Sequence, residues 1–552
     1  MMAIQTYFAI KDLGERKILF LVLLFSLLFS QILSKTPASD KPNVLMIMID
    51  DLNDCIEGMS GHRQSISPHI KKLADSGVFF KQAYTNAPMC GPSRASLFTG
   101  IYPHHSRNFF QAPWFKNEVL NNSRTIMEQF KDAGYGVYGT GKIMHHNQEH
   151  LWTEFENPAD YGPSPFNGKE RVPHPDVPAP FFDIGWVDGS LGPFVNLEGR
   201  KDQAGKALLW TTGNGNNIPY KEMRYRNDED RDPTPDEVNA NWAANMIRNF
   251  SKNKSDQAFF LAVGFLRPHT PLLAPQKYFD RFPLDEIELA TIKEGDSDDT
   301  HLNVAYKGDV FTLRFGREMH EAISKAYGGR EMGLKKWTQA YLACVAAVDD
   351  NVGTVMDALN NSPLKENTIV ILASDHGFHM GEKAYLYKNS LWEESTRIPL
   401  IMRVPNMTKA GSRIEQSISL IDVYPTLIEL CNLPNETKKN SKGHALDGRS
   451  LLPLLKNPKT TSWKNKPALT VVYAGPEYLN DPAKQHYALR SNRYRYILYN
   501  NGQEELYDHK KDPFEWANIA HKKKKRRKLF RQEIQAYFKE NKLGALENLQ
   551  LP

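Results

Sequence analysis

Residues that could do chemistry gather first around one cysteine. Cys90 opens the stretch 90–94 (CGPSR), and the chain then becomes apolar and helix-compatible up to Gly100. Pro92 suits the first turn of a helix, where its missing N–H costs nothing and its φ is already helical. We therefore expect Cys90 at a helix N-terminus, where free N–H groups favour an anion and lower the pKa of a thiol. Such a site suits a nucleophile facing an anionic substrate; the alternative is a buried structural cysteine.

Further polar residues stand where separate apolar runs end. The runs 43–49, 136–140, 258–263 and 368–373 are typical of strands buried on both faces. The residues that follow them are, in chain order, Asp50 and Asp51, Lys142 and His145, His269, and Asp375 and His376. Because ligands in open α/β sheets bind beyond the carboxyl ends of the strands, we expect these side chains to converge with Cys90. Each alone has a plainer interpretation, since an Asp after a strand is often a helix cap.

The types of these residues indicate a metal-assisted reaction on an anion. Asp50 and Asp51, with Asp375 from a distant strand, make a hard-oxygen site that suits Ca²⁺ first and Mg²⁺ second. A cation there would hold and polarise a substrate oxyanion. The nearby arginine and lysines add positive charge for a sulfate group, and the histidines can move protons.

The surrounding pattern indicates the fold that must position these residues. Buried strands alternate with helices, the strongest helix being 337–359, which predicts an α/β domain with a mainly parallel sheet flanked by helices. The segment 149–236 is rich in Pro, Gly, Asn and aromatic residues, and we interpret it as an insertion that walls the substrate pocket. The alternative is surface decoration. From about 463, shorter strands predict a small antiparallel sheet packed with a C-terminal helix at 529–538.

Length and composition bound the remaining possibilities. The 552 residues suit one large domain and a smaller one, which we place at 41–460 and 461–552. A net charge of +5 does not suggest a nucleic-acid partner. Residues 1–34 resemble an export signal, so we expect a periplasmic or secreted protein, with a membrane anchor only if that segment stays uncleaved. Four cysteines do not indicate a disulfide-based fold. The basic run 521–528, just before the last helix, is either a solvated face or a contact for a sulfated polymer.

Several motifs together resemble a known family. They are the Cys90 stretch followed by Thr99-Gly100, Gly139-Thr140-Gly141-Lys142, Ser374-Asp375-His376-Gly377, Asp447-Gly448-Arg449-Ser450 and Glu505-Leu506-Tyr507-Asp508. From about Lys41 onward the chain is similar to the type I, formylglycine-dependent sulfatases of the alkaline phosphatase superfamily. Within them it most resembles the iduronate-2-sulfatase branch. The signs of that branch are Lys142-x-x-His145, Arg267-Pro268-His269, and His376 where many sulfatases carry Asn.

The resemblance implies an alkaline-phosphatase-like fold and a role for each residue. Cys90 becomes formylglycine, whose hydrate attacks sulfur with one hydroxyl and, after deprotonation of the other, releases sulfate and restores the aldehyde. One Ca²⁺ is implied, held by Asp50, Asp51, the modified Cys90, Asp375 and His376. The remaining implied roles are oxygen positioning by Arg94 and Lys142, a base in His145, an acid in His269 and a second sulfate contact in Lys388. The plainer alternative for Lys388 is a surface lysine.

The implied function is a sulfuric ester hydrolase that releases sulfate from a sulfated carbohydrate. The implied partners are that carbohydrate and a formylglycine-generating or anaerobic sulfatase-maturating enzyme. The substrate is left open between a sugar 2-sulfate in a glycosaminoglycan and an algal polysaccharide such as ulvan, carrageenan or fucan. Two other functions stay open: a phosphodiesterase or phosphonate hydrolase of the same superfamily, and a non-catalytic glycan-binding relative in which Cys90 stays a thiol.

Overall fold

The computed structural model describes residues 41–213, 215, 218–253, 257–301, 311–460, 463, 466–544 and 546, without the side chains of 311–313. The expected export signal at 1–34 lies outside these residues. Within the described ranges, no helix combines the length and the apolar character needed to cross a membrane.

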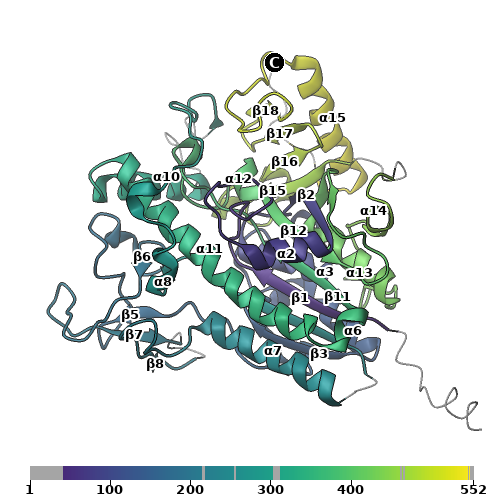
Figure 1. Ribbon diagram of the computed structural model, residues 1–552. Coiled ribbons are helices and arrows are strands. Elements are labelled where there is room, and N and C mark those ends of the chain that lie inside the picture. The colour runs from purple at the N-terminus through teal and green to yellow at the C-terminus, as the bar shows by residue number, and fades with distance from the viewer. Residues whose placement is uncertain are drawn as a thin grey trace, which may run out of the picture.

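A nine-stranded sheet forms the centre of the molecule (Figure 1). In spatial order its strands are β13 (Ser412–Ile414), β2 (Val78–Tyr84), β12 (Arg397–Arg403), β11 (Thr368–Ser374), β1 (Asn43–Ile49), β9 (Phe259–Phe265), β3 (Gly136–Gly141) and β4 (Glu154–Phe155), with β14 (Ile418–Ser419) beside β2. Only β12 runs against its neighbours; the pairs from β11 through β1, β9 and β3 to β4 are parallel. The predicted mainly parallel sheet is therefore confirmed.

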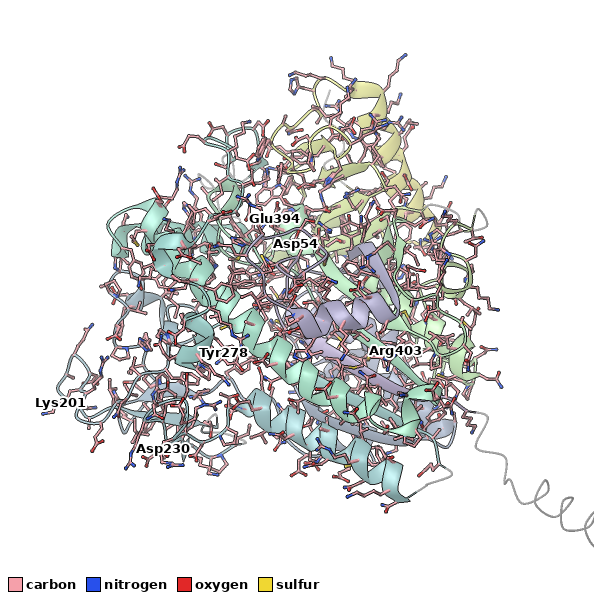
Figure 2. The ribbon with its side chains drawn as sticks, viewed as in Figure 1. Asp54, Lys201, Asp230, Tyr278, Glu394 and Arg403 are labelled. Atoms are coloured by element: carbon pink, nitrogen blue, oxygen red, sulfur yellow. The ribbon has the colours of Figure 1, made fainter. Side chains whose placement is uncertain are left out.

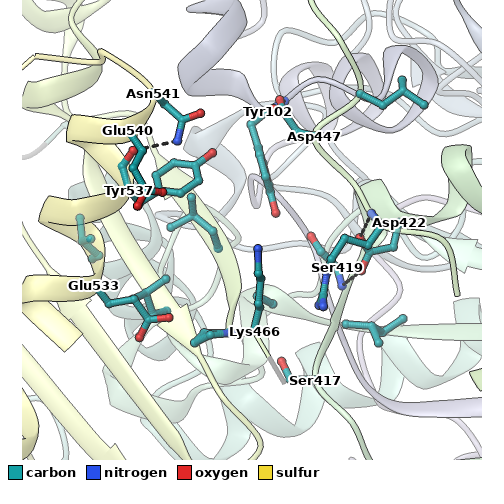
Figure 3. Close-up of a pocket in the computed structure, with 18 residues that line it drawn as sticks. Tyr102, Ser417, Ser419, Asp422, Asp447, Lys466, Glu533, Tyr537, Glu540 and Asn541 are labelled. Atoms are coloured by element: carbon teal, nitrogen blue, oxygen red, sulfur yellow. Dashed lines mark hydrogen bonds between the residues drawn. The ribbon is translucent and has the colours of Figure 1, made fainter. Parts of the chain in front are cut away.

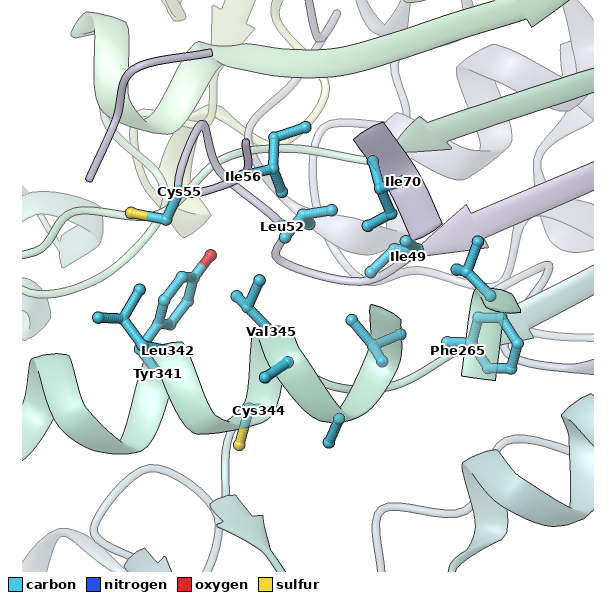
Figure 4. Packing of buried hydrophobic residues seen from close by; sticks show 14 of the residues in the cluster. Ile49, Leu52, Cys55, Ile56, Ile70, Phe265, Tyr341, Leu342, Cys344 and Val345 are labelled. Carbon is cyan, nitrogen blue, oxygen red and sulfur yellow. The ribbon is translucent and has the colours of Figure 1, made fainter. Parts of the chain in front are cut away.

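Helices cover both faces of this sheet, because the side chains on both faces of β1 are buried. Its seven residues are all buried and alternate between two apolar clusters, with Leu45 and Ile47 in one and Val44 and Met46 in the other. The first cluster is covered by α2 (Pro68–Ser76), α7 (Pro235–Asn253) and α11 (Arg330–Asn360), and the second by α3 (Cys90–Thr99), α6 (Ile126–Asp132) and α13 (Val423–Cys431). Figure 4 shows α11 packed beneath the end of β1.

Six further α-helices lie within the described residues up to 460. They are α4 (Pro103–Ser106), α5 (Glu118–Asn121), α8 (Gln276–Phe279), α10 (Phe311–Ala326), α12 (Glu393–Thr396) and α14 (Leu452–Lys456). All four cysteines are free and buried, in agreement with the expectation that disulfides do not hold the fold.

The segment 149–236 folds into small sheets beside the main one. One consists of β5 (Ser164–Phe166), β7 (Leu209–Thr212) and β8 (Lys221–Glu222), and β6 (Leu191–Pro193) pairs with β10 (Leu272–Ala274). A separate apolar cluster that includes Phe194 and Trp210 holds this insert together. Lys201 and Asp230 lie at its outer edge, away from the main sheet (Figure 2).

The C-terminal region forms the predicted antiparallel sheet packed with a helix. Its strands are β15 (Ala468–Val472), β16 (His486–Arg490), β17 (Tyr494–Leu498) and β18 (Glu504–Asp508), and α15 (Lys524–Glu540) covers them. The sequence did not predict β18. The prediction that the basic run 521–528 precedes the helix is wrong for its second half, because α15 already begins at Lys524.

A buried ion network joins the C-terminal sheet to the main domain. Arg495, fully buried on β17, bonds to Glu393 of α12 and to Glu515, whose Oε1 lies 2.5 Å from the Arg495 Nε. Burial alone would raise the pKa of Glu515, but Arg495 and His509 outweigh it and lower that pKa to about 2. Removing one partner of such a buried network leaves charge without compensation.

We therefore expect Arg495→Met to lower the free energy of unfolding by about 3 kcal/mol. Urea unfolding followed by circular dichroism measures this change. The control Arg526→Met alters an exposed arginine in the same region and should change stability by less than about 0.5 kcal/mol. Equal stability of the two variants would contradict the assigned role of Arg495.

Candidate active site

Cys90 is the first residue of α3, as the sequence predicted, and its side chain points into a buried cluster of charged groups. Its Sγ lies 3.2 Å from Nε2 of His376, 3.4 Å from Nζ of Lys388 and 3.9 Å from Oδ1 of Asp51. The expectation that the helix start lowers the thiol pKa is wrong. Burial, and then the nearby Asp50 carboxylate, raise the pKa of Cys90 well above the usual value, so the unmodified side chain stays a neutral thiol.

Three aspartates meet beside Cys90 because their strands are neighbours. β1 pairs in parallel with β11, with Ile49 opposite Ser374, so Asp50, Asp51 and Asp375 leave the sheet together. Asp51 adopts a left-handed φ of 60°, which few non-glycine residues adopt. The buried hydroxyl of Tyr341 on α11 donates to its carbonyl at 2.7 Å, and Figure 4 shows that hydroxyl directed toward the loop after β1.

Three cations balance the three carboxylates. Lys142 binds Asp50, and Nζ of Lys388 lies 2.8 Å and 2.9 Å from the two oxygens of Asp51. Arg94, fully buried, donates to Asp375 at 2.8 Å and to Asp50 at 3.1 Å. Its other hydrogen bonds go to the backbone carbonyls of residues 142 and 143, and it donates no hydrogen bond to Cys90. Arg94 therefore ties together the ends of β1, β3 and β11.

The donor groups fit a divalent cation. Ligand atoms of Asp50, Cys90, Asp375 and His376 lie within 4.8 Å of one another. The Nδ1 of His376 faces the carbonyl of Gly377 at 3.1 Å; a carbonyl only accepts, so Nδ1 carries the proton and Nε2 keeps its lone pair toward the cluster. His376 is thus placed as a ligand, and aspartate oxygens are the donors that hard cations prefer.

The charge state of Asp51 also fits a cation. Burial, opposed by Lys388 and reinforced by the neighbouring carboxylates Asp50 and Asp375, raises the pKa of Asp51 to about 6. Three carboxylates in one buried site repel each other, and a divalent cation relieves that repulsion.

The two predicted acid–base histidines make different contacts. His269 places Nε2 at 4.0 Å and 3.9 Å from oxygens of Asp50 and Asp51, and its Nδ1 donates to the Thr270 carbonyl at 2.6 Å. His145 makes no recorded contact with Cys90, and its buried Nδ1 has no partner among the described residues. Burial, and then Lys142, lower the pKa of His145 to about 3, so it is neutral at ordinary pH.

A close backbone contact sets the position of Lys142. Its N–H donates to the Gly264 carbonyl at 3.1 Å. A Cβ at Gly264 would lie 2.2 Å from the Lys142 carbonyl oxygen, which is also an acceptor for Arg94. Only glycine fits on β9 at this point.

We expect Gly264→Ala to destabilise the protein by about 2 kcal/mol and to lower catalytic activity about a hundredfold, because the loop that carries Lys142 must shift. Chemical unfolding and initial rates measure both effects. Gly329→Ala is the matched control, since its Cβ would meet no atom within 4 Å. Activity of Gly264→Ala equal to that control would contradict this role for the contact.

A cavity of about 750 Å³ adjoins the charged cluster. Lys142 and His145 line it on one side, and the insert supplies Tyr161, Arg171, Trp186 and Tyr220. The sequence predicted that the insert walls a pocket, but it did not identify these residues. The only signal for them was the richness of the segment in aromatic side chains. Tyr161 also lies under Lys142, whose Nζ is 4.7 Å from the centre of its ring.

Another cavity, of about 360 Å³, lies elsewhere between α15 and the main domain (Figure 3). Lys466 extends into it, and Asp422, Asp447 and Glu533 stand around it. None of the candidate catalytic residues lines this cavity, so it is separate from the cluster around Cys90.

Comparisons with known proteins agree with this geometry. The sulfatase family profile matches residues 42–433, and a profile described as "N-sulphoglucosamine sulphohydrolase, C-terminal" matches residues 381–542. A sulfatase from Formosa agariphila is 34% identical over 486 residues, covering 87% of this chain and 83% of the relative. Iduronate 2-sulfatase from Mus musculus is 29% identical, and the match covers 72% of this chain and 70% of the relative.

Solved structures share the fold. One was determined with its substrate D-glucosamine-2-N,6-O-disulfate; it has a TM-score of 0.63 at 20% identity and covers 91% of this chain and 99% of its own. The phosphonate monoester hydrolase of Agrobacterium radiobacter has a TM-score of 0.62 at 21% identity, with coverage of 91% and 96%. The predicted alkaline-phosphatase-like architecture is confirmed. With the profile match over most of its length, the chain belongs to the sulfatase family and is a sulfuric ester hydrolase.

Proposed function

We propose that this sulfatase removes sulfate from carbohydrates through a formylglycine made from Cys90. The observation that carries the proposal is the convergence of Cys90 with Asp50, Asp51 and Asp375 at one buried sheet edge. The raised pKa of the Cys90 thiol argues against a thiolate nucleophile. The hydrate of formylglycine would supply an oxygen nucleophile at the same place.

The charged side chains bind and orient the sulfate in this proposal. Lys142 and Lys388 flank the position of Cys90 and supply positive charge to the anionic ester. Arg94 fixes Asp50 and Asp375, and so holds the strand ends in register. A divalent cation held by Asp50, Asp51, Asp375 and His376, which we propose to be Ca²⁺, would polarise the sulfate oxygens. The aspartate donors support that choice.

The two histidines move protons. His145 is neutral and has a free buried nitrogen beside Lys142, which suits a base that deprotonates the second hydroxyl during sulfate release. His269 holds Nδ1 on the Thr270 carbonyl and directs Nε2 toward the aspartates. As the acid for the leaving alcohol, it must therefore carry protons on both nitrogens. Burial, and then Lys388 and Lys142, hold the pKa of His269 well below its usual value, so this role requires the bound anionic substrate to raise that pKa.

A carbohydrate substrate is supported by the cavity and by the relatives. The aromatic walls of the cavity suit the apolar faces of sugar rings. One relative is an iduronate 2-sulfatase, and one structural neighbour binds a sulfated glucosamine. We propose a glycosaminoglycan or algal polysaccharide as the source of the sugar.

The proposal also includes location and maturation. The N-terminal segment 1–34 has the pattern of an export signal, so we propose a periplasmic or secreted enzyme. Conversion of Cys90 requires a maturation enzyme as a transient partner.

The test is to express the chain with and without a maturation enzyme and to measure two properties of each product. Peptide mass spectrometry determines whether Cys90 carries a thiol or an aldehyde. Ion chromatography measures sulfate release from 4-nitrophenyl sulfate, glycosaminoglycan disaccharides and sulfated algal oligosaccharides, with a phenylphosphonate ester as the rival substrate. We expect sulfate release from a sugar only by the product with the aldehyde. Equal activity of the thiol form, or hydrolysis of the phosphonate ester alone, would refute the proposal.

A further inference from the structure

Arg171 is a buried cation in the wall of the substrate cavity. It is 7% exposed, and it lines the same cavity as Lys142 and His145. Its Cζ lies 4.4 Å from the centre of the Trp186 ring and 5.4 Å from that of Tyr220. Stacking on aromatic rings fixes the plane of a guanidinium while its N–H groups stay available for hydrogen bonds.

The charge of Arg171 is poorly compensated by the protein. It donates to the carbonyl of Gly213, and its nearest recorded carboxylate oxygen, on Asp160, lies 3.6 Å away. The Asp160 oxygens instead accept from the backbone N–H groups of Gly162 at 2.9 Å and Gly213 at 2.7 Å. The Nε of Arg171 has no partner among the described residues. Burial also lowers the pKa of Arg171, as expected for an under-compensated cation.

Two buried arginines at the charged clusters, Arg94 and Arg495, are paired more closely than Arg171. Arg267 instead bonds to three backbone carbonyls. Arg94 and Arg495 each hold two carboxylates within 3.1 Å. A buried charge is normally paired in this way, because leaving it without a partner is costly. Arg171 has a single, longer ion pair of 3.6 Å with Asp160 and stands at the wall of an open cavity. An anion supplied by a ligand would therefore complete its coordination.

We propose that Arg171 binds a second oxyanion of the substrate, either a ring carboxylate or an additional sulfate. This inference rests on the proposed function, in which Lys142 and Lys388 hold the sulfate ester that is cleaved. The substrate class is then an acidic or multiply sulfated sugar, and Arg171 is the residue that selects it. The planar fork of arginine matches either oxyanion through two parallel hydrogen bonds.

The test compares matched substrates with one or two anionic groups. They are a 2-sulfated hexose, the corresponding uronic acid 2-sulfate, and the hexose 2,6-disulfate. Matured wild type is assayed beside Arg171→Gln and Arg171→Lys. The control Arg200→Gln changes an exposed arginine of the same insert that pairs with Asp176.

We expect Arg171→Gln to lower kcat/KM about a hundredfold for a substrate with a second anion, because a charge-assisted hydrogen-bond pair is lost. The loss for the singly charged hexose sulfate should be less than about twofold. For a substrate with a second anion, kcat/KM of Arg171→Lys should lie between the values of wild type and Arg171→Gln, because lysine keeps the charge but lacks the planar guanidinium. A selective loss on the uronic acid identifies the carboxylate as the ligand, and a selective loss on the disulfate identifies sulfate. Equal losses on all three substrates, or no loss, would overturn the proposal.

Binding separates this inference from the proposed function. Isothermal titration calorimetry measures the binding of the same three sugars to the Cys90→Ala protein and to the Cys90→Ala, Arg171→Gln double variant. We expect the doubly charged sugars to bind at least about tenfold more tightly than the singly charged one, and only when Arg171 is present. If wild type hydrolyses none of them but this binding difference holds, the proposed function fails and the subsite stands. If no difference in binding is found even with Arg171 in place, the subsite is refuted.

Discussion

Cys90→Ala should lower the rate of sulfate release by about six orders of magnitude, which is the scale of removing a catalytic nucleophile. Alanine removes the side chain from which the attacking oxygen is proposed to be made. The change should leave the fold intact, because Arg94 keeps its hydrogen bonds to Asp50 and Asp375, and Lys388 keeps its bond to Asp51. The measurement is kcat for sulfate release by ion chromatography, with chemical unfolding as the check on folding.

The control for this prediction lies in the other buried cysteines. Cys344 lies on α11 and Cys431 lies on α13. The control variants are Cys344→Ala and Cys431→Ala. Each should cost about 1 kcal/mol of stability, by loss of a small buried group, and should leave kcat within about twofold. Residual activity of Cys90→Ala comparable to these controls would exclude Cys90 as the source of the nucleophile.

Removal of the divalent cation should produce the second-largest effect, a loss of about three orders of magnitude in kcat/KM. In the structure Lys142 and Lys388 neutralise Asp50 and Asp51. A cation held by the aspartates would take over that neutralisation and would leave both lysines available to the sulfate. Chelation therefore removes the metal charge and also returns the lysines to the aspartates. The measurement is activity after EDTA treatment and dialysis, followed by addition of Ca²⁺ or Mg²⁺, with Ca²⁺ expected to restore more.

A pair of variants tests the same site without a chelator. Asp51→Asn removes one proposed ligand charge and should lower kcat/KM about a hundredfold. We expect Ca²⁺ to raise the melting temperature of wild type, and Asp51→Asn should abolish that rise. Asp54→Asn is the control from the same loop, since Asp54 pairs with Arg397 at 3.2 Å and lies outside the cluster. Full activity of chelated wild type, or equal behaviour of the two variants, would contradict a metal at Asp51.

The buried strands and the residues directly after them could be predicted from the sequence. The apolar run at 43–49 coincides with β1, and that at 368–373 with all but the last residue of β11. A strand buried on both faces leaves an uninterrupted apolar signature, and a parallel neighbour ends at the same edge. Hence Asp50 and Asp375 could be expected to meet from their positions in the chain alone.

The electrostatics and the pocket wall could not be predicted in the same way. The pKa of Cys90 depends on burial and on Asp50, which together outweigh the helix start, and a local motif contains neither quantity. Arg171, Trp186 and Tyr220 meet through irregular backbone, where no periodicity fixes which side chains share a face. β18 (Glu504–Asp508) could not be predicted, because three of its five residues are acidic and such residues are depleted in strands.

The burial of Cys90 has a consequence for the order of events during synthesis. The residue is 1% exposed, at the first position of α3, a helix that packs on the central sheet. An enzyme that modifies Cys90 must therefore reach it on an extended chain, and conversion competes kinetically with folding. A chain that folds first becomes a stable but unconverted population. The fraction of active protein then reports the ratio of two rates, so slowing the collapse of the sheet during synthesis should raise the yield of converted enzyme.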